Sequence, residues 1–182
     1  NAIEIANSSA NVTINNLAAG TIGSGVSFHQ NIQPAFSLYN SGTNQSVSGT
    51  SFVKMQLNQA DCDTVSGFND SEDRYDFQVA GFYFIFAQIQ FGGGIVTNNS
   101  LQAGFHFYDA SAGSGTNYTS ITQAPPFDGG DNICGTAIAV VNASVGDYVY
   151  AQALRAVSSG DSTVIMNGTD RNSILSGFKI LG

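Results

Sequence analysis

Residues 75–91 read YDFQVAGFYFIFAQIQF, and we interpret them as the end of one strand, a turn at Ala80-Gly81 and a long second strand. Side chains of a strand alternate between its two faces, so the composition of each face can be read directly. The two faces of the second strand carry Phe82, Phe84 and Phe86 on one side and Tyr83, Ile85, Ala87 and Ile89 on the other. Both faces are apolar, whereas a strand of an antiparallel sandwich usually has one face in water.

Two apolar faces predict two burial partners for this strand. One is the core of the chain itself, and the other is either a second copy of the chain or a loop of the same chain. Gln88 and Gln90 make the phenylalanine face polar further along the strand. We therefore expect the second contact to cover only the first half of the strand.

The composition favours an all-β fold. Among 182 residues only 10% are charged while 42% are hydrophobic, and Asn, Ser, Thr and Gly fill much of the rest. Such a chain suits strands joined by short turns and offers few of the Leu, Glu, Lys and Arg runs that helices favour. Apolar runs bounded by turn residues predict about ten strands, no helix and one main domain.

The charge excludes several classes of partner. The formal net charge is −8 and the chain has only five Lys and Arg residues. Nucleic-acid binding needs clustered basic residues that displace counterions, and an anionic membrane surface attracts the same residues. No apolar run approaches the roughly 20 residues of a membrane-spanning helix. We expect neither nucleic-acid binding nor membrane insertion.

The first 25 residues differ from the rest. Ile3-x-Ile5 recurs as Val12-x-Ile14, each pair followed by polar residues. Such short strands are too weak to fold alone and need neighbours. We interpret residues 1–25 as a stalk or docking arm that contacts its partner through Ile3, Ile5, Val12 and Ile14, and residues 26–182 as the main domain. An ordinary flexible lead-in is the alternative.

The chain has no motif that supports catalysis. His29 and His106 are the only histidines, which leaves no three-ligand zinc set and no Ser-His-Asp arrangement. No glycine-rich phosphate loop occurs. We therefore expect no enzyme activity. Cys62 and Cys134 have no metal-binding spacing, and we expect free thiols, with a disulfide between them as the alternative.

Calcium is the one metal that the sequence could hold. Six carboxylates fall within sixteen residues, namely Asp61, Asp63, Asp70, Glu72, Asp73 and Asp76. Clustered oxygen ligands on a loop can bind Ca²⁺, but the spacing lacks the remaining ligand positions of an EF-hand. A solvated acidic loop is the alternative, and it applies equally to Asp128 and Asp131. No other cofactor is expected.

The spacing from Leu57 to Ala87 resembles the signature of the complement C1q globular domain, a ten-stranded antiparallel jelly roll akin to tumour necrosis factor. The positions that match it outright are Asp63, Phe68, Gly81 and Tyr83. Apolar substitutes stand at Leu57, Tyr75 and Ile85, and Ala87 lacks the family's aromatic ring. The stretches Gly146-Asp147-Tyr148-Val149 and Ser176-Gly177-Phe178 resemble two later elements of the family, so the resemblance covers residues 34–181.

The resemblance implies a homotrimer whose axis is lined by aromatic strands. The residues that we expect at the subunit interface are Phe82, Tyr83, Phe84, Ile85, Ala87 and Phe178. Some C1q domains bind calcium, which adds a reason to consider the acidic cluster. The segments PAFSLYNSGTNQSVSGTSFVKMQLN and FNDSEDRYDFQVAGFYFIFAQIQF are similar in style to the C1q-like domains that end bacteriophage fibres, and no collagen repeat precedes them.

These observations favour a trimeric attachment head of a bacteriophage fibre, exposed on the surface of the virion. It would bind a host-surface saccharide or protein through loops distal to the stalk, with Tyr108, Asn117, Tyr118, Phe127, Asp128 and Asp131 as candidate contacts. A trimeric capsid decoration or cement protein, held on the shell by residues 1–20, is the alternative. A secreted C1q-like lectin is a third.

Overall fold

The computed structural model describes residues 33–42, 44–47, 51–92, 100–123, 133–156, 164–166 and 171–181. They all belong to one unit, Ile32–Gly182. The proposed arm, with Ile3, Ile5, Val12 and Ile14, lies outside the described residues, and so do Phe127, Asp128 and Asp131. The expectations for these seven residues stay predictions.

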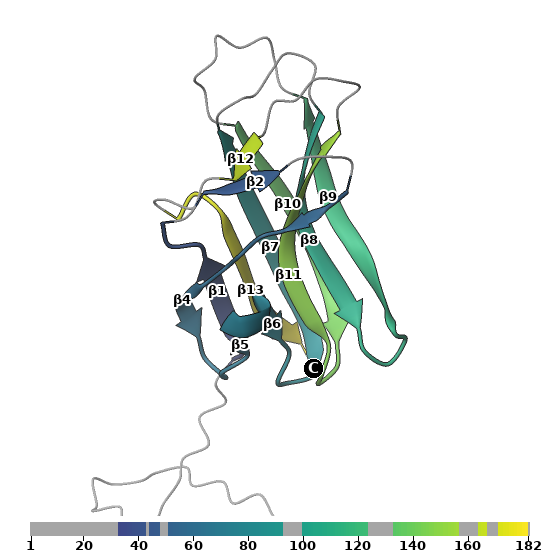
Figure 1. The fold of residues 1–182 in the computed structure, drawn as a ribbon. Coiled ribbons are helices and arrows are strands. Elements are labelled where there is room, and N and C mark those ends of the chain that lie inside the picture. The colour runs from purple at the N-terminus through teal and green to yellow at the C-terminus, as the bar shows by residue number, and fades with distance from the viewer. Residues whose placement is uncertain are drawn as a thin grey trace, which may run out of the picture. The chain divides into compact units, whose positions relative to one another are not determined.

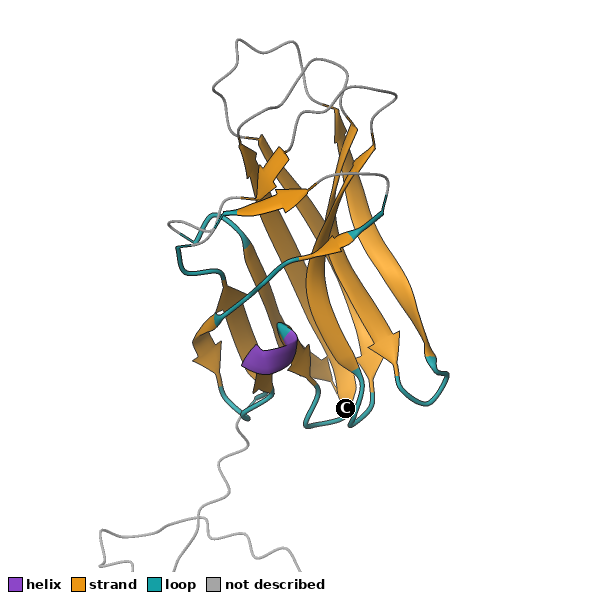
Figure 2. Ribbon diagram, viewed as in Figure 1, coloured by secondary structure: helices purple, strands orange, loops and turns teal. Residues whose placement is uncertain are grey.

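The described residues form two antiparallel β-sheets that pack face to face (Figure 1 and Figure 2). Sheet A contains β1 (Ala35–Tyr39), β2 (Gln45–Val47), β4 (Gln59–Asp63), β7 (Gly81–Gly92), β10 (Ile133–Ala143), β12 (Val164–Met166) and β13 (Ile174–Leu181). Sheet B contains β3 (Val53–Lys54), β5 (Phe68–Asn69), β6 (Arg74–Asp76), β8 (Ser100–Asp109), β9 (Ser114–Gln123) and β11 (Tyr148–Ala156). One short 3₁₀ turn, η1, spans Asp70–Glu72.

This arrangement confirms the all-β, antiparallel jelly-roll sandwich. Thirteen strands are described instead of the ten expected, because β2, β3, β5, β6 and β12 are pieces of only two or three residues. The described residues include no α-helix, and none of their helical segments is long and apolar enough to cross a membrane.

The long strand expected from the phenylalanine run, β7, is the centre of sheet A. One edge of β7 pairs with β10, and the other pairs with β13 and, at its far end, with β12. From β13 the sheet continues through β1 to β4. Sheet B runs β5-β6-β11-β8-β9, so β9 and β10 are edge strands of different sheets within the described structure, and they contact one another.

The core lies between the two sheets, and it includes the β7 face that carries Tyr83, Ile85 and Ala87. Tyr83, Ile85 and Ala87 have no solvent exposure in the single chain, like Ile89 and Phe91 further along. A side chain that is already fully buried gains nothing from a partner subunit. The prediction that Tyr83, Ile85 and Ala87 belong to a subunit interface is therefore wrong, because the strand's alternation directs them into the core.

Aromatic rings fill the end of the core where β7 begins. Phe36 stacks on Tyr75 with ring centroids 3.8 Å apart, and Phe77 meets the edge of Tyr83 at 4.7 Å. The backbone at Gly67 passes so close to Tyr75 that a Cβ there would lie 2.5 Å from the ring. Glycine at this position therefore allows the loop before β5 to close over the aromatic cluster.

The side chain of Asp63 holds the loop between β4 and β5 in place. Its carboxylate accepts hydrogen bonds from the backbone N–H groups of Val65, Gly67 and Phe68, at 3.3, 3.1 and 2.9 Å. Asx-type contacts of this kind fix a turn by satisfying its unpaired amides. The interval from Asp63 to Phe68 thus forms one hydrogen-bonded loop between β4 and β5.

Candidate functional site

The outer face of sheet A carries an uncovered apolar surface. Alternation places Phe82, Phe84 and Phe86 of β7 on this face, opposite to the core. Neighbouring strands add four more apolar side chains, and we call the whole set the apolar face: Phe82, Phe84, Phe86, Ile138, Val140, Phe178 and Ile180. Five of its members are among the large exposed hydrophobic residues of the structure, with Ile138 58% and Phe178 46% exposed.

Strand register joins these side chains into one surface. Phe84 lies opposite Val140 of β10 on one side and opposite Phe178 of β13 on the other. The rings of Phe84 and Phe178 are in contact, with centroids 5.4 Å apart. Phe86 lies opposite Ile138. The apolar face therefore spans three adjacent strands, which is what a macromolecular contact requires and what scattered surface hydrophobes lack.

The second half of the same face is polar. Gln88 lies opposite Thr136, and Gln90 lies opposite Cys134. The Gln88 side chain donates a hydrogen bond to the backbone oxygen of Asn172 at 3.3 Å. The polarity change that Gln88 and Gln90 indicated is thus present across two strands, β7 and β10.

The adjacent edge strands β9 and β10 contain no charged residue. Their sequences are SGTNYTSITQ and ICGTAIAVVNA. Natural proteins usually protect an open sheet edge with Lys, Pro or other charged residues, because unpaired backbone groups there invite another chain. Two long edges without charge are a second feature that suits contact with another molecule.

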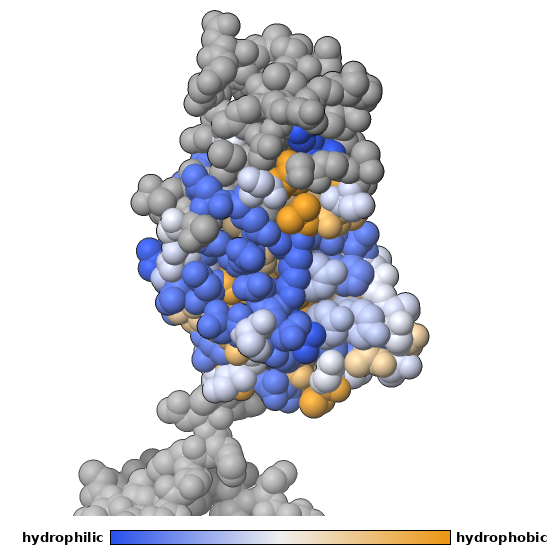
Figure 3. Space-filling model, viewed as in Figure 1, coloured by the Kyte–Doolittle hydropathy of each residue, from blue (hydrophilic) through white to orange (hydrophobic). Residues whose placement is uncertain are grey.

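The outer face of sheet B has a different character. Figure 3 shows this face, which is mostly hydrophilic. Near the end of β8 and the start of β11 it carries four aromatic side chains in two cross-strand pairs: Tyr108 on Tyr148, with centroids 4.6 Å apart, and His106 on Tyr150, at 5.0 Å. Burial raises the pKa of both Tyr148 and Tyr150 above the ordinary value, so their hydroxyl groups stay protonated at neutral pH.

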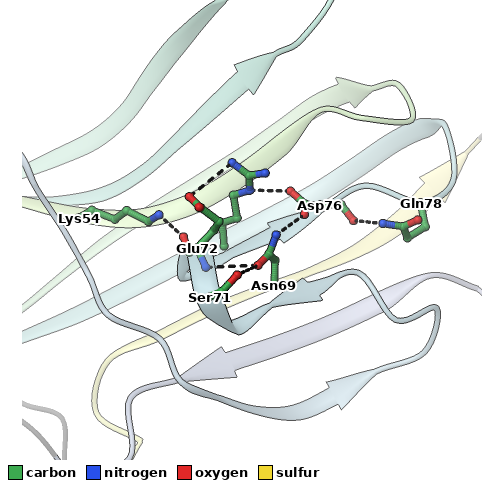
Figure 4. Close-up of polar contacts among 7 residues, drawn as sticks. Lys54, Asn69, Ser71, Glu72, Asp76 and Gln78 are labelled. Atoms are coloured by element: carbon green, nitrogen blue, oxygen red, sulfur yellow. Dashed lines mark hydrogen bonds and ion pairs between the residues drawn. The ribbon is translucent and has the colours of Figure 1, made fainter.

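Two basic side chains flank these rings and are neutralised locally. Arg74 lies 4.1 Å from the ring centroid of Tyr148 and pairs with Asp76, Nε to Oδ1, at 2.7 Å. Lys54 lies over Tyr150 and donates to the backbone oxygen of Glu72 (Figure 4). Desolvation lowers the pKa of Lys54, although Asp73 and Glu72 oppose that shift. The face therefore offers no uncompensated positive patch for an anion.

The structure separates the candidate ligand residues. Tyr108 and Asn117 lie on the outer face of sheet B, and Asn117 Oδ1 contacts His106 Nδ1 there at 2.6 Å. Tyr118 points the other way and stacks on the core residue Phe105, with centroids 5.0 Å apart. The prediction that Tyr118 contacts a ligand beside Asn117 is wrong, because adjacent residues of a strand face opposite sides.

The location of Tyr108 also differs from the expectation of a loop distal to the stalk. Tyr108 lies near the end of β8, next to the turn that leads into β9. That turn is at the same end of the sandwich as the start of β1 (Figure 1). Tyr148 and Tyr150 were missed by sequence reasoning, because only the β8–β11 register brings them beside Tyr108 and His106.

Three of the six clustered carboxylates, Asp61, Asp63 and Asp76, have separate roles. Asp61 accepts two hydrogen bonds from Arg171, which lowers its pKa, and Asp63 closes the loop described above. Asp76 pairs with Arg74 and accepts from Asn69 at 2.9 Å. No group of three or more potential metal-ligating side chains occurs within the described ranges. Calcium binding stays an untested possibility of the sequence, since Asp128 and Asp131 lie outside those ranges.

The two cysteines lie on strands far apart in sheet A. Cys62 is on β4 and Cys134 is on β10, and both are free thiols. The strands β1, β13 and β7 lie between them. Four strand spacings of about 4.8 Å separate the two strands by roughly 19 Å, far beyond the reach of a disulfide.

No model of a known protein family matches the sequence, and no curated protein matches it. Solved structures, in contrast, show similarity over most of the described fold. The globular domain of zebrafish complement 1qA protein superposes with a TM-score of 0.56 at 12% identity, covering 81% of this chain and 97% of that one.

Two further solved structures belong to the tumour necrosis factor group. Murine APRIL at pH 8.5 superposes with a TM-score of 0.58 at 14% identity, covering 81% of this chain and 99% of that one. The Eiger TNF of S. frugiperda gives 0.59 at 11% identity, covering 81% and 92%. At these identities the likeness establishes a C1q/TNF-like fold.

Proposed function

We propose that the chain forms a non-enzymatic homotrimer that serves as the attachment head of a bacteriophage fibre and binds a host-surface saccharide or protein. The observation that carries this proposal is the apolar face. Its seven side chains stand on three adjacent strands, and several are about half exposed in the single chain. Burying a large apolar side chain contributes about 1.5–3 kcal/mol, so the set supplies a strong drive for association.

A trimer fits because the molecule offers two different contact surfaces. The apolar face belongs to the middle of sheet A, and the charge-free edge belongs to β9 and β10. Subunits that join through two unlike surfaces associate head to tail. Every apolar face is then covered only in a closed ring of subunits. A three-membered ring agrees with the trimer that the C1q resemblance implies.

The phage setting is supported by the sequence segments that resemble fibre-terminal C1q-like domains. The low fraction of charged residues and the abundance of Asn, Ser, Thr and Gly suit a particle surface that contacts other surfaces mainly through uncharged groups. The described residues also contain no cluster of His, Cys, Asp and Glu of the kind that supports metal-assisted catalysis. An attachment head that only binds its ligand needs no such cluster.

A capsid decoration protein is the second candidate, because the repeated pairs Ile3/Ile5 and Val12/Ile14 could dock on a shell. The two functions make different demands on the same full-length chain. An attachment head competes with phage particles for host cells, and its competition survives Ile3→Asp/Ile5→Asp. A decoration protein binds empty shells, loses that binding with the double substitution, and does not compete for cells.

The test therefore measures both activities with purified wild-type chain and the double variant. We expect the wild-type chain to reduce phage adsorption to host cells in a dose-dependent manner, and the variant to do so equally. Absence of competition together with saturable decoration of shells would replace the attachment proposal by the decoration function.

A further inference from the structure

The aromatic rings on sheet B stand on edge. Tyr108 and Tyr148 have ring centroids 4.6 Å apart and planes inclined by 14°, and His106 and Tyr150 are 5.0 Å apart and inclined by 23°. Rings that lie flat beside one another on a sheet cannot approach so closely. The two pairs are therefore stacked across the strands, and the rings present their rims to solvent.

Stacking covers both faces of the rings on β11. Tyr148 lies between Tyr108 and the guanidinium group of Arg74, which is 4.1 Å from its centroid. Tyr150 lies between His106 and the ammonium group of Lys54, which is 5.1 Å away. These two tyrosines have no ring face left for a ligand.

Tyr108 differs because it stands at the end of its row. The residue opposite it on the next strand, β9, is Gly115, which has no side chain. Tyr148 is the only ring that packs against Tyr108 within the described structure. A glycine inside a strand commonly marks a place where another group approaches closely. Within the described structure, neither a second ring nor a side chain at the opposite position of β9 covers the face of Tyr108 that is turned toward β9.

Hydrogen bonds beside this ring define a donor and an acceptor. Asn117 Oδ1 accepts from Gln152 Nε2 at 2.9 Å and contacts His106 Nδ1 at 2.6 Å, which fits the imidazole tautomer that carries its proton on Nδ1. His106 Nε2 is then an acceptor, and the amide nitrogen of Asn117 is a donor. Neither His106 Nε2 nor the amide nitrogen of Asn117 has a hydrogen-bond partner within the described part of the chain.

Gly115 also determines where His106 lies. A Cβ added to Gly115 would be 2.0 Å from His106 Nε2 and 2.5 Å from Cε1. The imidazole therefore leans over Gly115, which brings its acceptor atom to the β9 side of the face, where the open face of Tyr108 also lies. Any larger residue at position 115 would displace it.

The strand beside this site is uncharged, and the adjacent carboxylate is occupied by hydrogen bonds. β9 contains no charged residue, and the Asp109 carboxylate is engaged by the turn after β8, where Ser111 N donates at 2.9 Å and Ala112 N at 2.9 Å. An open aromatic face with an adjacent acceptor and donor matches a sugar ring, whose C–H face packs on the aromatic ring while neighbouring hydroxyl groups donate and accept.

We propose that Tyr108, His106 and Asn117, with Gly115 as the residue that leaves room for the His106 imidazole, form a binding site for an uncharged pyranose with vicinal hydroxyl groups. The site lies on the side of the sandwich, near the β8–β9 turn. This inference rests on the proposed attachment function and gives its ligand a chemical class, a neutral host-surface glycan.

The site is tested with the full-length chain and a panel of uncharged methyl pyranosides, the glucoside, galactoside and mannoside, at up to about 50 mM, because a shallow one-sugar site binds in the millimolar range. Binding is measured from NMR shifts of the His106, Tyr108, Gly115 and Asn117 signals. At least one sugar is expected to shift these signals in a saturable way.

Matched variants test the geometry. Tyr108→Phe keeps the aromatic face and should bind within about twofold of the wild type, whereas Tyr108→Ala should weaken binding about tenfold or more. Gly115→Ala should also weaken it, because the new methyl group displaces His106. Tyr148→Phe is the control, since both faces of that ring are covered, and it should leave affinity unchanged. Melting temperatures establish that each variant is folded.

The outcomes separate this inference from the proposed function. If no uncharged sugar shifts these signals, or if folded Tyr108→Ala binds like the wild type, the site assignment is wrong. If wild type and Tyr108→Ala compete equally with phage for host cells, the attachment function stands and the site assignment fails. If the sugar binds at Tyr108 but the wild type does not compete for cells, the site stands and the attachment function fails.

Discussion

Phe84 and Phe178 lie opposite one another on β7 and β13, with ring centroids 5.4 Å apart, on the face of sheet A that points away from the core. Phe178 is 46% exposed. Two contacting phenylalanines on a solvent-facing sheet surface cost free energy in an isolated chain. Their position is readily explained if a second copy of the chain covers them.

The first prediction concerns Phe178→Asp. A carboxylate introduced into an apolar subunit contact would have to be desolvated without a partner, which costs several kcal/mol. We expect this variant to remain folded, because the side chain lies outside the core, and to dissociate into monomers. Its mass is measured by light scattering at micromolar concentration.

Val145→Asp is the matched control for this variant. Val145 is 65% exposed, but it lies in the turn between β10 and β11 and not on one of the three strands that form the apolar face. The same change of an exposed apolar side chain should leave the assembly intact there. Dissociation of both variants, or of neither, would argue against the apolar face as the subunit contact.

The second prediction concerns the buried hydroxyl group of Tyr75. Its side chain is fully buried, and the Tyr75 oxygen has no hydrogen-bond partner among the described residues. An unsatisfied buried polar group costs about 1–3 kcal/mol, so Tyr75→Phe should raise the free energy of unfolding by about that amount. The ring stack on Phe36 is retained.

Tyr83→Phe provides the opposite case in the same core. The Tyr83 hydroxyl donates to the backbone oxygen of Val79 at 2.7 Å. Removing it should lower the free energy of unfolding by about 0.5–1.5 kcal/mol. Urea denaturation of the two variants and the wild type measures both effects. A loss of stability in Tyr75→Phe would show that its hydroxyl is satisfied after all.

The third prediction is a loss of stability in alkali. Burial raises the pKa of Tyr75 above the ordinary value of 10.0, and burial also raises that of Tyr83. As the pH rises past about 10, these tyrosines ionise in the unfolded chain before they ionise in the folded one. The contribution of these two tyrosines to the free energy of unfolding should therefore be constant below about pH 10 and fall above it, by at most about 1.4 kcal/mol per pH unit for each such group.

Urea titrations between about pH 8 and pH 11.5 would measure this slope, because that range brackets the pKa of free tyrosine, which is about 10. Tyr75→Phe should show a shallower fall than the wild type. Equal slopes in the two proteins would mean that Tyr75 ionises as easily in the folded chain as in the unfolded one.

The fourth prediction concerns the loop between β4 and β5. Asp63→Ala leaves three backbone N–H groups without their acceptor and should cost about 1–3 kcal/mol of stability. Asp70 is exposed, and Asp70→Ala should change stability by no more than about 0.5 kcal/mol. Chemical denaturation compares the two. Equal effects would mean that the loss of a negative charge, not of the loop's acceptor, determines the stability.

The strand pattern predicted much of this structure because alternation depends only on neighbouring residues. The long strand β7 and the separation of Tyr83 and Ile85 from Phe82 and Phe84 follow from the period of two, but the pattern did not show which of these two apolar faces enters the core. The same rule, applied to β9, shows that Tyr118 and Asn117 face opposite sides. The error at Tyr118 came from treating that stretch as a loop when it is a regular strand.

Cross-strand neighbours could not be predicted in this way. Tyr148 lies forty residues beyond Tyr108 in the sequence, and only the β8–β11 register stacks the two rings. The placement of the His106 imidazole over Gly115 likewise depends on the β8–β9 pairing. Register is set by the packing of the whole sandwich, so sequence periodicity identifies the faces of each strand but not the residues that meet across strands.

The most direct test of the central claim is the mass of the wild-type chain in solution. Multi-angle light scattering at micromolar concentration should return three times the 19.0 kDa of the single chain, with no monomer peak on dilution into the nanomolar range. A single species of 19.0 kDa at micromolar concentration would contradict the account, because the apolar face would then be exposed in the functional molecule.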